Sequence, residues 1–357
     1  MAGTRHYLRP AALHAGAEAE RLTAAGRARP ILGGGWACSL FEALRWPTDG
    51  PLESVWVDAG EIAARDDPLL AHLTAPRPAP FDRPRLMGIL NVTPDSFSDG
   101  GQHQGADAAV AHGLRLVAAG ADIVDVGGES TRPGAVEVPA EEELRRVLPV
   151  VQRLAGQGAT VSIDTRKASV MRAAVAAGAQ IINDVSGLAH DPASLEVAAS
   201  CNAFVVLMHM QGTPATMNVA PRYERCALEV FDHLAGRIEA CTAAGIARTR
   251  LIVDPGLCFG KHEPENLDIL RNLALFHGLG VPVLLGASRK GWTAALETGW
   301  RAGERLPSTL AATLWGLNQG IQLFRVHDVA EHRQLLTAWE ALAGLAPEKN
   351  DRTGEAE

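Results

Sequence analysis

Short apolar runs of the chain end in polar side chains at eight places, and these polar residues have the types needed for binding and catalysis. In chain order they are Asn91; Glu129, Thr131 and Arg132; Asp164; Asn183; His209; Asp254; Ser288 and Lys290; and Arg325 and His327. An aspartate or asparagine after a strand is commonly a helix cap, which is a structural role. Arginine, lysine and histidine do not cap helices in this way, so eight such endings in succession indicate one shared site.

The candidate residues fall into two chemical groups. Asp164, Asn183 and Asp254 supply acceptor oxygens, which match the adjacent N–H donors of a flat, guanidine-like heterocycle. A cationic group suited to phosphate or diphosphate consists of Arg289, Lys290, Arg325 and His327, with Asn91 and Thr131 nearby. A flat polar ring attached to a phosphate ester would satisfy both groups. The alternative is that the carboxylates pair with Lys290 and Arg325 in a purely structural network.

Helices that end in glycine alternate with buried strands after Pro84. Residues 118–126 and 176–185 repeat one pattern, in which glycine closes a helix and an apolar strand follows. The predicted strands are 86–90, 123–126, 160–163, 180–182, 204–208, 251–253, 283–285 and 321–326. Eight strands alternating with helices predict a (β/α)8 TIM barrel, in which the carboxyl ends of all strands meet at one mouth. A doubly wound sheet is the alternative, and the absence of a Gly-x-Gly-x-x-Gly turn after the first strand disfavours it.

Residues 1–80 differ from the rest of the chain. They contain four possible short strands or turns and three consecutive glycines at 33–35, but no polar cluster at a strand end. The proline-rich segment 76–84 is stiff and extended, which indicates a boundary. We therefore predict an N-terminal capping appendage at 1–80, a barrel at 81–345 and a disordered polar tail at 346–357. An independent active domain at 1–80 is the disfavoured alternative.

Composition argues against several classes of function. The 357 residues include 33 Lys and Arg against 41 Asp and Glu, and this net charge of −8 is unlike that of proteins that bind nucleic acid or membrane surfaces. No apolar run has membrane-spanning length, and residues 1–15 lack the pattern of a signal peptide. The five cysteines are widely spaced, as in a reduced cytoplasmic protein, and no zinc site is expected. We expect a cytoplasmic enzyme that acts on small molecules.

Seven sequence blocks, at 87–101, 127–134, 162–165, 182–185, 254–261, 288–290 and 325–329, carry a resemblance to a known family. In this order, from about residue 85 to residue 343, the chain resembles dihydropteroate synthase. The resemblance implies a (β/α)8 barrel that joins 6-hydroxymethyl-7,8-dihydropterin diphosphate to 4-aminobenzoate with Mg2+. Pyrophosphate is released and 7,8-dihydropteroate forms. It also implies a homodimeric transferase of folate biosynthesis that is a target of sulfonamides.

The resemblance implies roles for individual residues. The pterin ring would contact Asp164, Asn183, Met208, Asp254, Phe259, Gly286 and Lys290; the diphosphate would contact Asn91, Arg325 and His327, with Asn91 also a Mg2+ ligand; and 4-aminobenzoate would contact Thr131, Arg132, Pro133 and Ser288. The residues expected to act in catalysis are Asn91, Thr131, Arg132, Lys290, Arg325 and His327. Diphosphate is already a good leaving group, and the electron-rich ring can stabilise a cation at its methylene carbon. An SN1-like path is therefore expected, and it needs charge neutralisation and exclusion of water by a lid, for which the loops after the first two strands, at 93–101 and 127–134, are the candidates.

Three other functions remain open. A methyltetrahydrofolate:corrinoid methyltransferase would share the pterin pocket but would not need the blocks at 130–133, 288–290 and 325–327. A non-catalytic pterin-binding paralogue is disfavoured by the complete set of site residues. An aldolase that forms a Schiff base on Lys290 is disfavoured because this lysine lies beyond its strand. Cys258 departs from the family, which often has glycine at this position, and this affects the expected affinities rather than the reaction.

Overall fold

The computed structural model describes residues 3–345, except 63–66, 93–101, 133 and 294–299. The predicted lid at 93–101, Pro133 and the predicted tail at 346–357 therefore lie outside the described residues. Eight parallel strands form the main sheet: β5 (Arg85–Asn91), β6 (Ile123–Gly127), β7 (Val161–Asp164), β8 (Ile181–Asp184), β9 (Phe204–Met208), β10 (Leu251–Asp254), β11 (Leu284–Leu285) and β12 (Leu323–Val326). They pair in the order β10–β9–β8–β7–β6–β5–β12–β11, and a parallel bridge between Val253 and Val283 joins the two ends. The predicted (β/α)8 barrel is confirmed, and every strand lies at the apolar run that predicted it.

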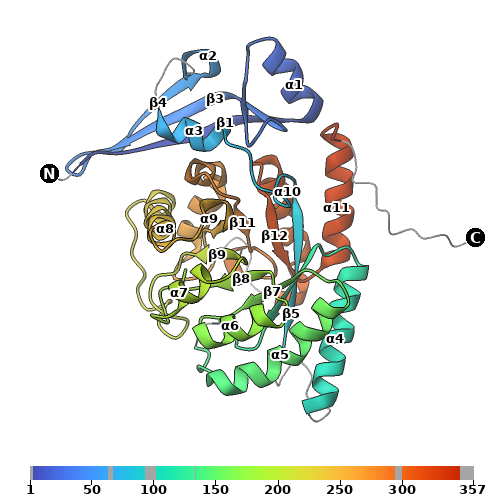
Figure 1. Cartoon of the computed structure of the whole chain (residues 1–357). Coiled ribbons are helices and arrows are strands. Elements are labelled where there is room, and N and C mark those ends of the chain that lie inside the picture. Colours follow the sequence, from blue (N-terminus) through green and yellow to red (C-terminus); the bar gives the residue numbers. More distant parts are fainter. Residues whose placement is uncertain (1–2, 63–66, 93–101, 133, 294–299, 346–357) are drawn as a thin grey trace, which may run out of the picture.

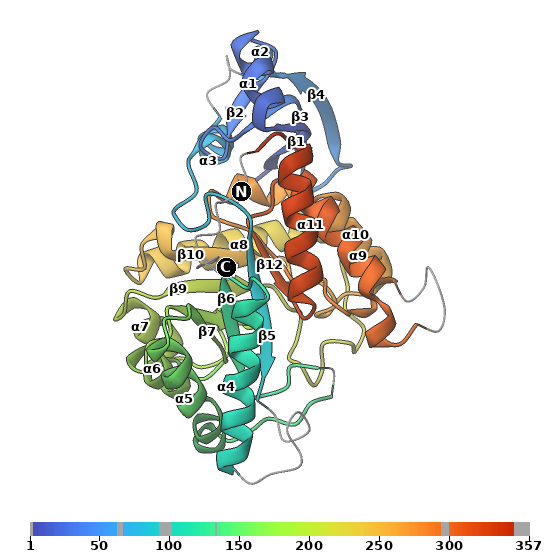
Figure 2. The same cartoon turned by 90° about the vertical axis from the view of Figure 1, so that its right-hand side faces the viewer.

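Helices surround the barrel and connect its strands (Figures 1 and 2). They are α4 (Gln102–Ala118), α5 (Ala140–Gly156), α6 (Ala168–Ala176), α7 (Ser194–Ala199), α8 (Cys226–Ala243), α9 (Glu263–Arg271), α10 (Leu306–Asn318) and α11 (Val329–Leu342), with short 3-10 helices η2 (Arg248–Arg250), η3 (Leu273–Leu279), η4 (Gly291–Thr293) and η5 (Ala302–Glu304). Glycines follow α4, α6 and α8 in the left-handed conformation, with φ values of 103° at Gly120, 108° at Gly178 and 92° at Gly245. These glycines allow each helix to stop and the chain to turn into the next strand, as predicted.

The inward-facing side chains of the strands form an apolar layer at the end where the strands begin. This layer contains Met87, Ile123, Ile181, Val206, Ile252, Leu284 and Leu323, all of them buried. Phe81 belongs to the same cluster, and its ring meets that of Phe204 edge-on at a centroid distance of 5.1 Å. Hydrocarbon therefore seals this end of the barrel, and the carboxyl ends of the strands form the end at which a ligand can bind.

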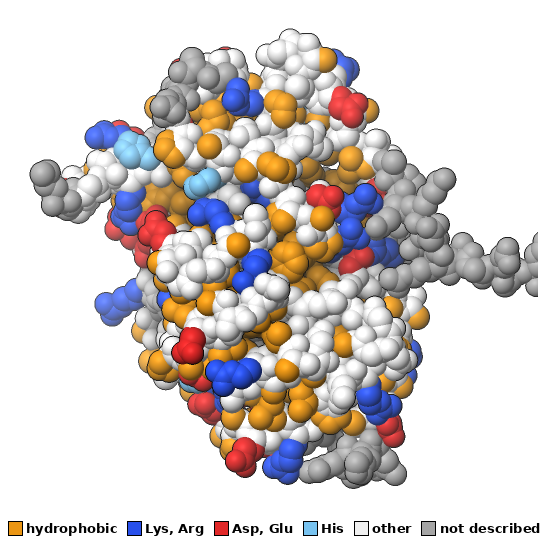
Figure 3. All heavy atoms as spheres, viewed as in Figure 1, with side chains coloured by type: hydrophobic (Ala, Val, Ile, Leu, Met, Phe, Trp, Pro, Cys, Tyr) orange, Lys and Arg blue, Asp and Glu red, His pale blue; other side chains and the backbone are white. Residues whose placement is uncertain are grey.

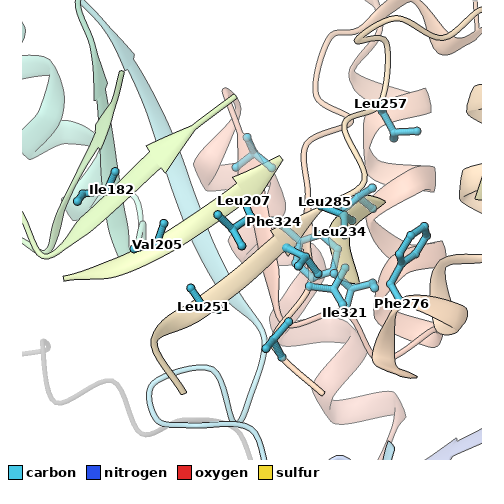
Figure 4. Packing of buried hydrophobic residues seen from close by; sticks show 14 of the residues in the cluster. Ile182, Val205, Leu207, Leu234, Leu251, Leu257, Phe276, Leu285, Ile321 and Phe324 are labelled. Carbon is cyan, nitrogen blue, oxygen red and sulfur yellow. The ribbon is translucent and has the colours of Figure 1, made fainter. Parts of the chain in front are cut away.

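The alternate residues of each strand point outward and pack against the helices. Ile182, Val205, Leu207, Leu251 and Phe324 belong to this second set, and Figure 4 shows Phe324 in one group of side chains with Leu234, Leu285 and Ile321. Burial of both faces explains why the strands have nearly continuous apolar sequences. The same alternation fixes which residues of a strand can reach the barrel interior.

The appendage is a four-stranded antiparallel sheet with short helices. Its elements are β1 (Arg5–Ala15), α1 (Gly16–Ala24), β2 (Arg29–Ile31), β3 (Trp36–Trp46), β4 (Glu53–Asp58), α2 (Ala59–Ile62) and α3 (Pro68–Thr74), and β3 pairs with the other three strands. Four strands were predicted here, but β1 and β3 have 11 residues each, so the prediction that all were short is wrong. The edge strand β1 continues through Pro10 because the register shifts there, and an edge strand tolerates the missing N–H.

The appendage contacts the barrel at the end where the strands begin, which is the upper end of the barrel in Figure 1, so the polar mouth faces away from the appendage. The hydroxyl of Tyr7 donates to Asp232 of α8 at 2.8 Å, and the rings of Trp36 and Trp339 stack with centroids 6.0 Å apart. Arg77 is buried and donates to the carbonyl of His277 at 3.0 Å. These contacts place the appendage at the end of the barrel opposite its polar mouth.

The surface of the molecule carries both signs of charge. On the face drawn in Figure 3, basic and acidic side chains are interspersed with apolar ones rather than gathered in one basic patch. Within the described part of the chain, no helix is both long enough and apolar enough to cross a membrane.

Candidate active site

A layer of mostly polar side chains lies directly above the apolar layer of the barrel. Because side chains alternate along a strand, the next inward position is two residues further along each strand. Counting from the apolar layer, and from Ser162 on β7, these positions are Ile89, Asp125, Asp164, Asn183, Met208, Asp254, Gly286 and Arg325. Six of the eight residues were predicted as site residues from the sequence, so the barrel brings the predicted pterin subsite together.

Arg325 connects three strands within this polar layer. Its Nε donates to Oδ2 of Asp125 at 2.6 Å, and its Nη2 donates to Oδ2 of Asp164 at 2.7 Å. Asn183 donates its amide N–H to the same oxygen of Asp125 at 3.0 Å. Because Asp125 here acts only as an acceptor, the amide oxygen of Asn183 must point away from it. Among the described residues, Oδ1 of Asp125 and Oδ1 of Asp164 are buried without a hydrogen-bond partner.

Burial and mutual repulsion disfavour the ionised form of one carboxylate in the layer. Burial, with the nearby Asp125, raises the pKa of Asp164 to about 7, although Arg325 opposes this shift. Burial alone would lower the pKa of Arg325, but the two carboxylates raise it above its ordinary value. The guanidinium therefore stays charged, whereas Asp164 can change its protonation state near neutral pH.

Asp254 and Lys290 form a second charged group on the other side of the layer. Oδ1 of Asp254 accepts from the backbone N–H of Gly256 at 2.7 Å, and Nζ of Lys290 donates to the carbonyl of Leu257 at 2.9 Å. Burial raises the pKa of Asp254 and lowers that of Lys290, and the two opposite charges partly offset these shifts. Nζ of Lys290 also lies 4.7 Å from the centroid of the Phe259 ring, a cation–π distance.

Gly286 leaves space between these two charged groups. A Cβ atom at this position would lie 3.5 Å from Nζ of Lys290 and 3.7 Å from Oδ2 of Asp254. A larger side chain would therefore fill the region between the ammonium and the free carboxylate oxygen. The missing side chain keeps this part of the polar layer available to a flat ligand.

Ser288 and His327 form a hydrogen-bonded pair at the mouth, above the polar layer. Oγ of Ser288 lies 3.0 Å from Nδ1 of His327 and accepts the backbone N–H of His327 at 3.1 Å. When the hydroxyl proton is directed at Nδ1, the neutral imidazole carries its own proton on Nε2 and can donate it. Burial and the neighbouring arginines lower the pKa of His327 to about 4, so the ring is a neutral donor near neutral pH.

Arg289, another member of the predicted cationic group, is held by an ion pair. Its Nε donates to Asp328 at 3.0 Å, and its Nη2 makes a second contact with the same carboxylate. This ion pair leaves Nη1 without a partner in it, so a role of Arg289 in binding an anion stays a prediction. Arg325 is the member of the group that lies in the polar layer.

Asn91 ends β5 with an exposed side chain. A Cβ atom at Gly127 would lie 3.8 Å from Oδ1 of Asn91 and 3.7 Å from Oδ2 of Asp164, so both oxygens face one point of the mouth. Among the described residues, no three His, Cys, Asp or Glu side chains form a cluster that could hold a metal ion.

Thr131 and Arg132 lie on the loop after β6, where Thr131 is partly buried and Arg132 is exposed. A buried network fixes the start of this loop: Glu129 pairs with Arg166 at 2.6 Å and with Lys167, and it accepts the backbone N–H of Val138 at 3.0 Å. Glu129 is therefore a structural anchor of the loop. His209 likewise binds Lys261 rather than the polar layer.

Asp125 is the site residue that sequence reasoning missed. It was treated as part of an apolar run, although it is fully buried and binds both Arg325 and Asn183. The signal was present, because Asp125 follows Ile123 by the same two residues that separate Leu323 from Arg325. A count along each strand from its apolar-layer residue would have identified it.

Known proteins match this barrel. A family model described as pterin binding enzyme matches residues 87–327. A dihydropteroate synthase of Escherichia coli (strain K12) is 46% identical over 273 residues, which cover 76% of this chain and 95% of the relative. Two structures of Xanthomonas albilineans dihydropteroate synthase, one with 4-aminobenzoic acid and one with 7,8-dihydropteroate, have TM-scores of 0.70 and 0.66. They are 50% and 44% identical to this chain and cover 74% of it and 95% of their own chains.

One relative also matches most of the appendage. A probable bifunctional folylpolyglutamate synthase/dihydropteroate synthase of Haloferax volcanii is 41% identical over 341 residues. The match covers 95% of this chain and 39% of the relative. Since only 5% of the chain is left out, the match must include most of residues 1–80.

Proposed function

The chain belongs to the pterin-binding enzyme family, and within it to the dihydropteroate synthases, and we propose that the polar layer of its barrel binds the pterin ring. The enzyme acts in folate biosynthesis. It joins 6-hydroxymethyl-7,8-dihydropterin diphosphate to 4-aminobenzoate, releases pyrophosphate and forms 7,8-dihydropteroate. The relatives named above are synthases, which favours this reaction over methyl transfer to a corrinoid protein.

The observation that carries the ring assignment is the set of free acceptor oxygens in the polar layer. Asp125 and Asp164 each have one buried oxygen without a partner among the described residues, and Asp254 uses Oδ1 for the N–H of Gly256, which leaves Oδ2 for a ligand. A dihydropterin presents N–H groups at its 2-amino group, N3 and N8. We place the amino group and N3 against Asp254, and the remaining ring nitrogens against Asn183 and Asp164. Lys290 would face the ring carbonyl, with Met208 and Phe259 on the two faces of the ring.

The diphosphate lies, in this proposal, above the polar layer against Arg325 and His327. Arg325 uses Nε and Nη2 for its two carboxylates, which leaves Nη1 for an anion. Ser288 holds His327 so that its Nε2–H points away from the hydroxyl and can donate to the same anion. Both donors are fixed before the substrate arrives, so they stabilise growing negative charge without reorganisation.

Asn91 would hold Mg2+ together with oxygens of the diphosphate. An exposed amide oxygen at the mouth, with no complete protein cage among the described residues, fits a cation that is bound largely by substrate phosphates. When bound, Mg2+ would neutralise charge on the departing pyrophosphate. Asn91 would orient the bound Mg2+ more than it would strengthen its binding.

The protein needs no strong base for this reaction. Departure of pyrophosphate leaves a cation at the methylene carbon that the electron-rich ring stabilises, and the aromatic amine then attacks this carbon. Arg325 and His327 would offset the leaving charge, while Phe259 and Met208 would shield the ring from water. We place 4-aminobenzoate against Ser288 and the loop that carries Thr131, Arg132 and Pro133. Sulfonamides would compete for this subsite.

Release of pyrophosphate tests the reaction. The purified full chain is incubated with the dihydropterin diphosphate, with and without 4-aminobenzoate and Mg2+, and pyrophosphate is measured over time. We expect turnover that depends on both additions. A protein that releases no pyrophosphate in response to 4-aminobenzoate would refute the proposed function.

A homodimer formed through the outer wall of the barrel is also proposed. Leu314 and Trp315 on α10 are large apolar side chains with exposed fractions of 41% and 45%. Light scattering coupled to size-exclusion chromatography measures the mass directly, and a monomer at micromolar concentration would contradict the proposal. A cytoplasmic location is expected for a reduced enzyme of this kind and remains a prediction.

A further inference from the structure

Lys261 is a buried ammonium near the active site that the reaction scheme does not yet use. It lies between β10 and α9 and is only 4% exposed. Nζ donates to three backbone carbonyls, those of Gly256 at 2.9 Å, Phe259 at 3.1 Å and His209 at 3.3 Å. Its fourth contact is Nδ1 of His209 at 2.9 Å. Among the described residues, no carboxylate forms an ion pair with it.

A buried lysine without a carboxylate partner needs a specific reason to remain. Removing an ammonium from water costs free energy, and burial lowers the pKa of Lys261 to about 8. Three carbonyls and an imidazole nitrogen resemble the oxygen-rich surroundings of a small monovalent cation. The ammonium of Lys261 therefore holds together three backbone carbonyls, those of Gly256, Phe259 and His209.

The backbone that converges on Lys261 is the turn 256–259, which contacts the proposed pterin ring. The N–H of Phe259 donates to the carbonyl of Gly256 at 3.1 Å and closes this turn. Between them, the carbonyl of Leu257 accepts from Nζ of Lys290 at 2.9 Å. The turn thus presents the Phe259 ring and fixes the ammonium of Lys290 in one unit.

This turn is not stable by local preference alone. Gly256, Cys258 and Gly260 have φ values of 71°, 65° and 59°, so three of five consecutive residues are left-handed. A left-handed conformation is unfavourable for Cys258, which is not a glycine. Such a conformation persists only where surrounding contacts enforce it, and Lys261 bonds to the carbonyls at both ends of the turn.

We propose that Lys261 is a positioning residue for the pterin half of the reaction: its ammonium fixes the turn 256–259 and thereby places Phe259 and Lys290 against the ring. This inference rests on the proposed function and deepens it. Lys261 does not touch substrate in this scheme, and it acts through the turn. The residues that we place against the diphosphate are Arg325 on β12 and His327 directly after it, so they lie outside this turn.

Two ligands separate the positioning role from general damage to the protein. In Lys261→Met, we expect the Kd of the dihydropterin diphosphate, measured by calorimetry, to rise about tenfold or more. The Kd of pyrophosphate alone should stay within about twofold, because it does not contact the ring subsite. Equal loss for both ligands, or no loss for either in the folded variant, would overturn the proposal.

Arg77→Met is the matched control. Arg77 is also a 4% exposed cation held by backbone carbonyls, those of His72, Ala75 and His277, but it lies at the opposite end of the barrel. The Arg77→Met substitution should lower the melting temperature and leave both Kd values unchanged. If Lys261→Met does not fold, Lys261→Gln, which keeps two N–H donors for the carbonyls, is titrated in the same way. Wild-type turnover is measured in parallel, so a failure of the proposed function is distinguished from a failure of this inference.

Discussion

The appendage and the barrel bury their apolar strand faces in different ways. The main apolar cluster of the appendage includes Leu8, Phe41 and Leu73, and no charged side chain is buried among the described residues before residue 76, although Arg77 is buried at the junction with the barrel. The barrel places a charged layer directly on its apolar layer, with Asp125, Asp164 and Arg325 largely withdrawn from water. Buried charges cost free energy even when they are paired, so they indicate the region where function rather than stability determined the residues.

The comparisons with known proteins also separate the appendage from the barrel. The Escherichia coli relative is covered almost completely by a match to 76% of this chain, about the share of the barrel. The appendage is thus additional to what a dihydropteroate synthase requires. We expect it to act as a cap that stabilises the base of the barrel, and the following predictions test that division.

The largest effect is expected when one substitution is made at the polar layer of the barrel and compared with the same substitution at the junction between the barrel and the appendage. Asp254→Asn replaces an acceptor of the polar layer by a group that also presents N–H donors, so kcat/KM should fall about 1,000-fold or more. Asp232→Asn alters the junction with the appendage and should leave kcat/KM unchanged while lowering stability by about 1 kcal/mol. We would measure kcat/KM and the free energy of unfolding for both variants. A loss of kcat/KM in Asp232→Asn comparable to that in Asp254→Asn would contradict the prediction.

Lowering the pH should reduce activity through protonation of Asp164, a residue of the barrel. Asp164 faces Arg325 on β12, Asp125 on β6, Glu143 on α5 and Asp184 on β8, and its pKa is raised to about 7. If only the ionised form binds the ring, kcat/KM should fall about tenfold for each pH unit below 7.

The sign of this effect separates activity from unfolding. A carboxyl group whose pKa is raised on folding contributes stability at low pH, and that contribution is lost as pH rises through about 7. Protonation of Asp164 therefore does not unfold the protein as activity declines. Asp125→Asn removes a neighbouring negative charge and should move the acid limb to lower pH. A pH profile that is flat through neutrality, or one that Asp125→Asn leaves in place, would contradict the assignment.

Removal of residues 1–80 should have a small effect on activity and a clear effect on stability. The deletion loses the Tyr7–Asp232 hydrogen bond and the Trp36–Trp339 stack, both at the base of the barrel. We expect kcat/KM within about threefold of wild type and a melting temperature lower by about 5 °C or more. Loss of activity in a folded deletion variant would show that the appendage contributes to the site.

The smallest effect is expected within the turn 256–259. Cys258→Gly relieves an unfavourable left-handed conformation and should raise the free energy of unfolding by up to about 1 kcal/mol. Gly260→Ala is the control of opposite sign, because its Cβ would lie 2.8 Å from the carbonyl oxygen of Gln211. Denaturant midpoints of the two variants test this, and a destabilised Cys258→Gly would mean that packing of the thiol outweighs the strain.

Much of the barrel could be predicted because it is periodic. Buried parallel strands have apolar sequences, and glycines end the preceding helices, so all eight strands were found within a few residues. Six of the eight residues of the polar layer were predicted; Ile89 carries no polar group, and Asp125 was hidden inside an apolar run. The two-residue alternation that would have revealed it becomes decisive only once the inward residues of every strand are known.

Other features depend on tertiary contacts that no local pattern records. The ion pair that holds Arg289 requires Asp328 to lie beside it, 39 residues away along the chain. The convergence of Gly256, Phe259 and His209 on Lys261 depends on how two neighbouring strands end. The length of β1 depends on its pairing with β3, which allowed the strand to pass through Pro10.

Phe81 links the order of synthesis to the closure of the barrel. Its partners in the apolar layer extend to Leu323 on the last strand of the sheet, so they leave the ribosome long after it does. N-terminal units generally fold first during synthesis. The appendage is thus completed while Phe81 still has no burial site, and this side chain reaches its final position only when nearly the whole chain has been translated.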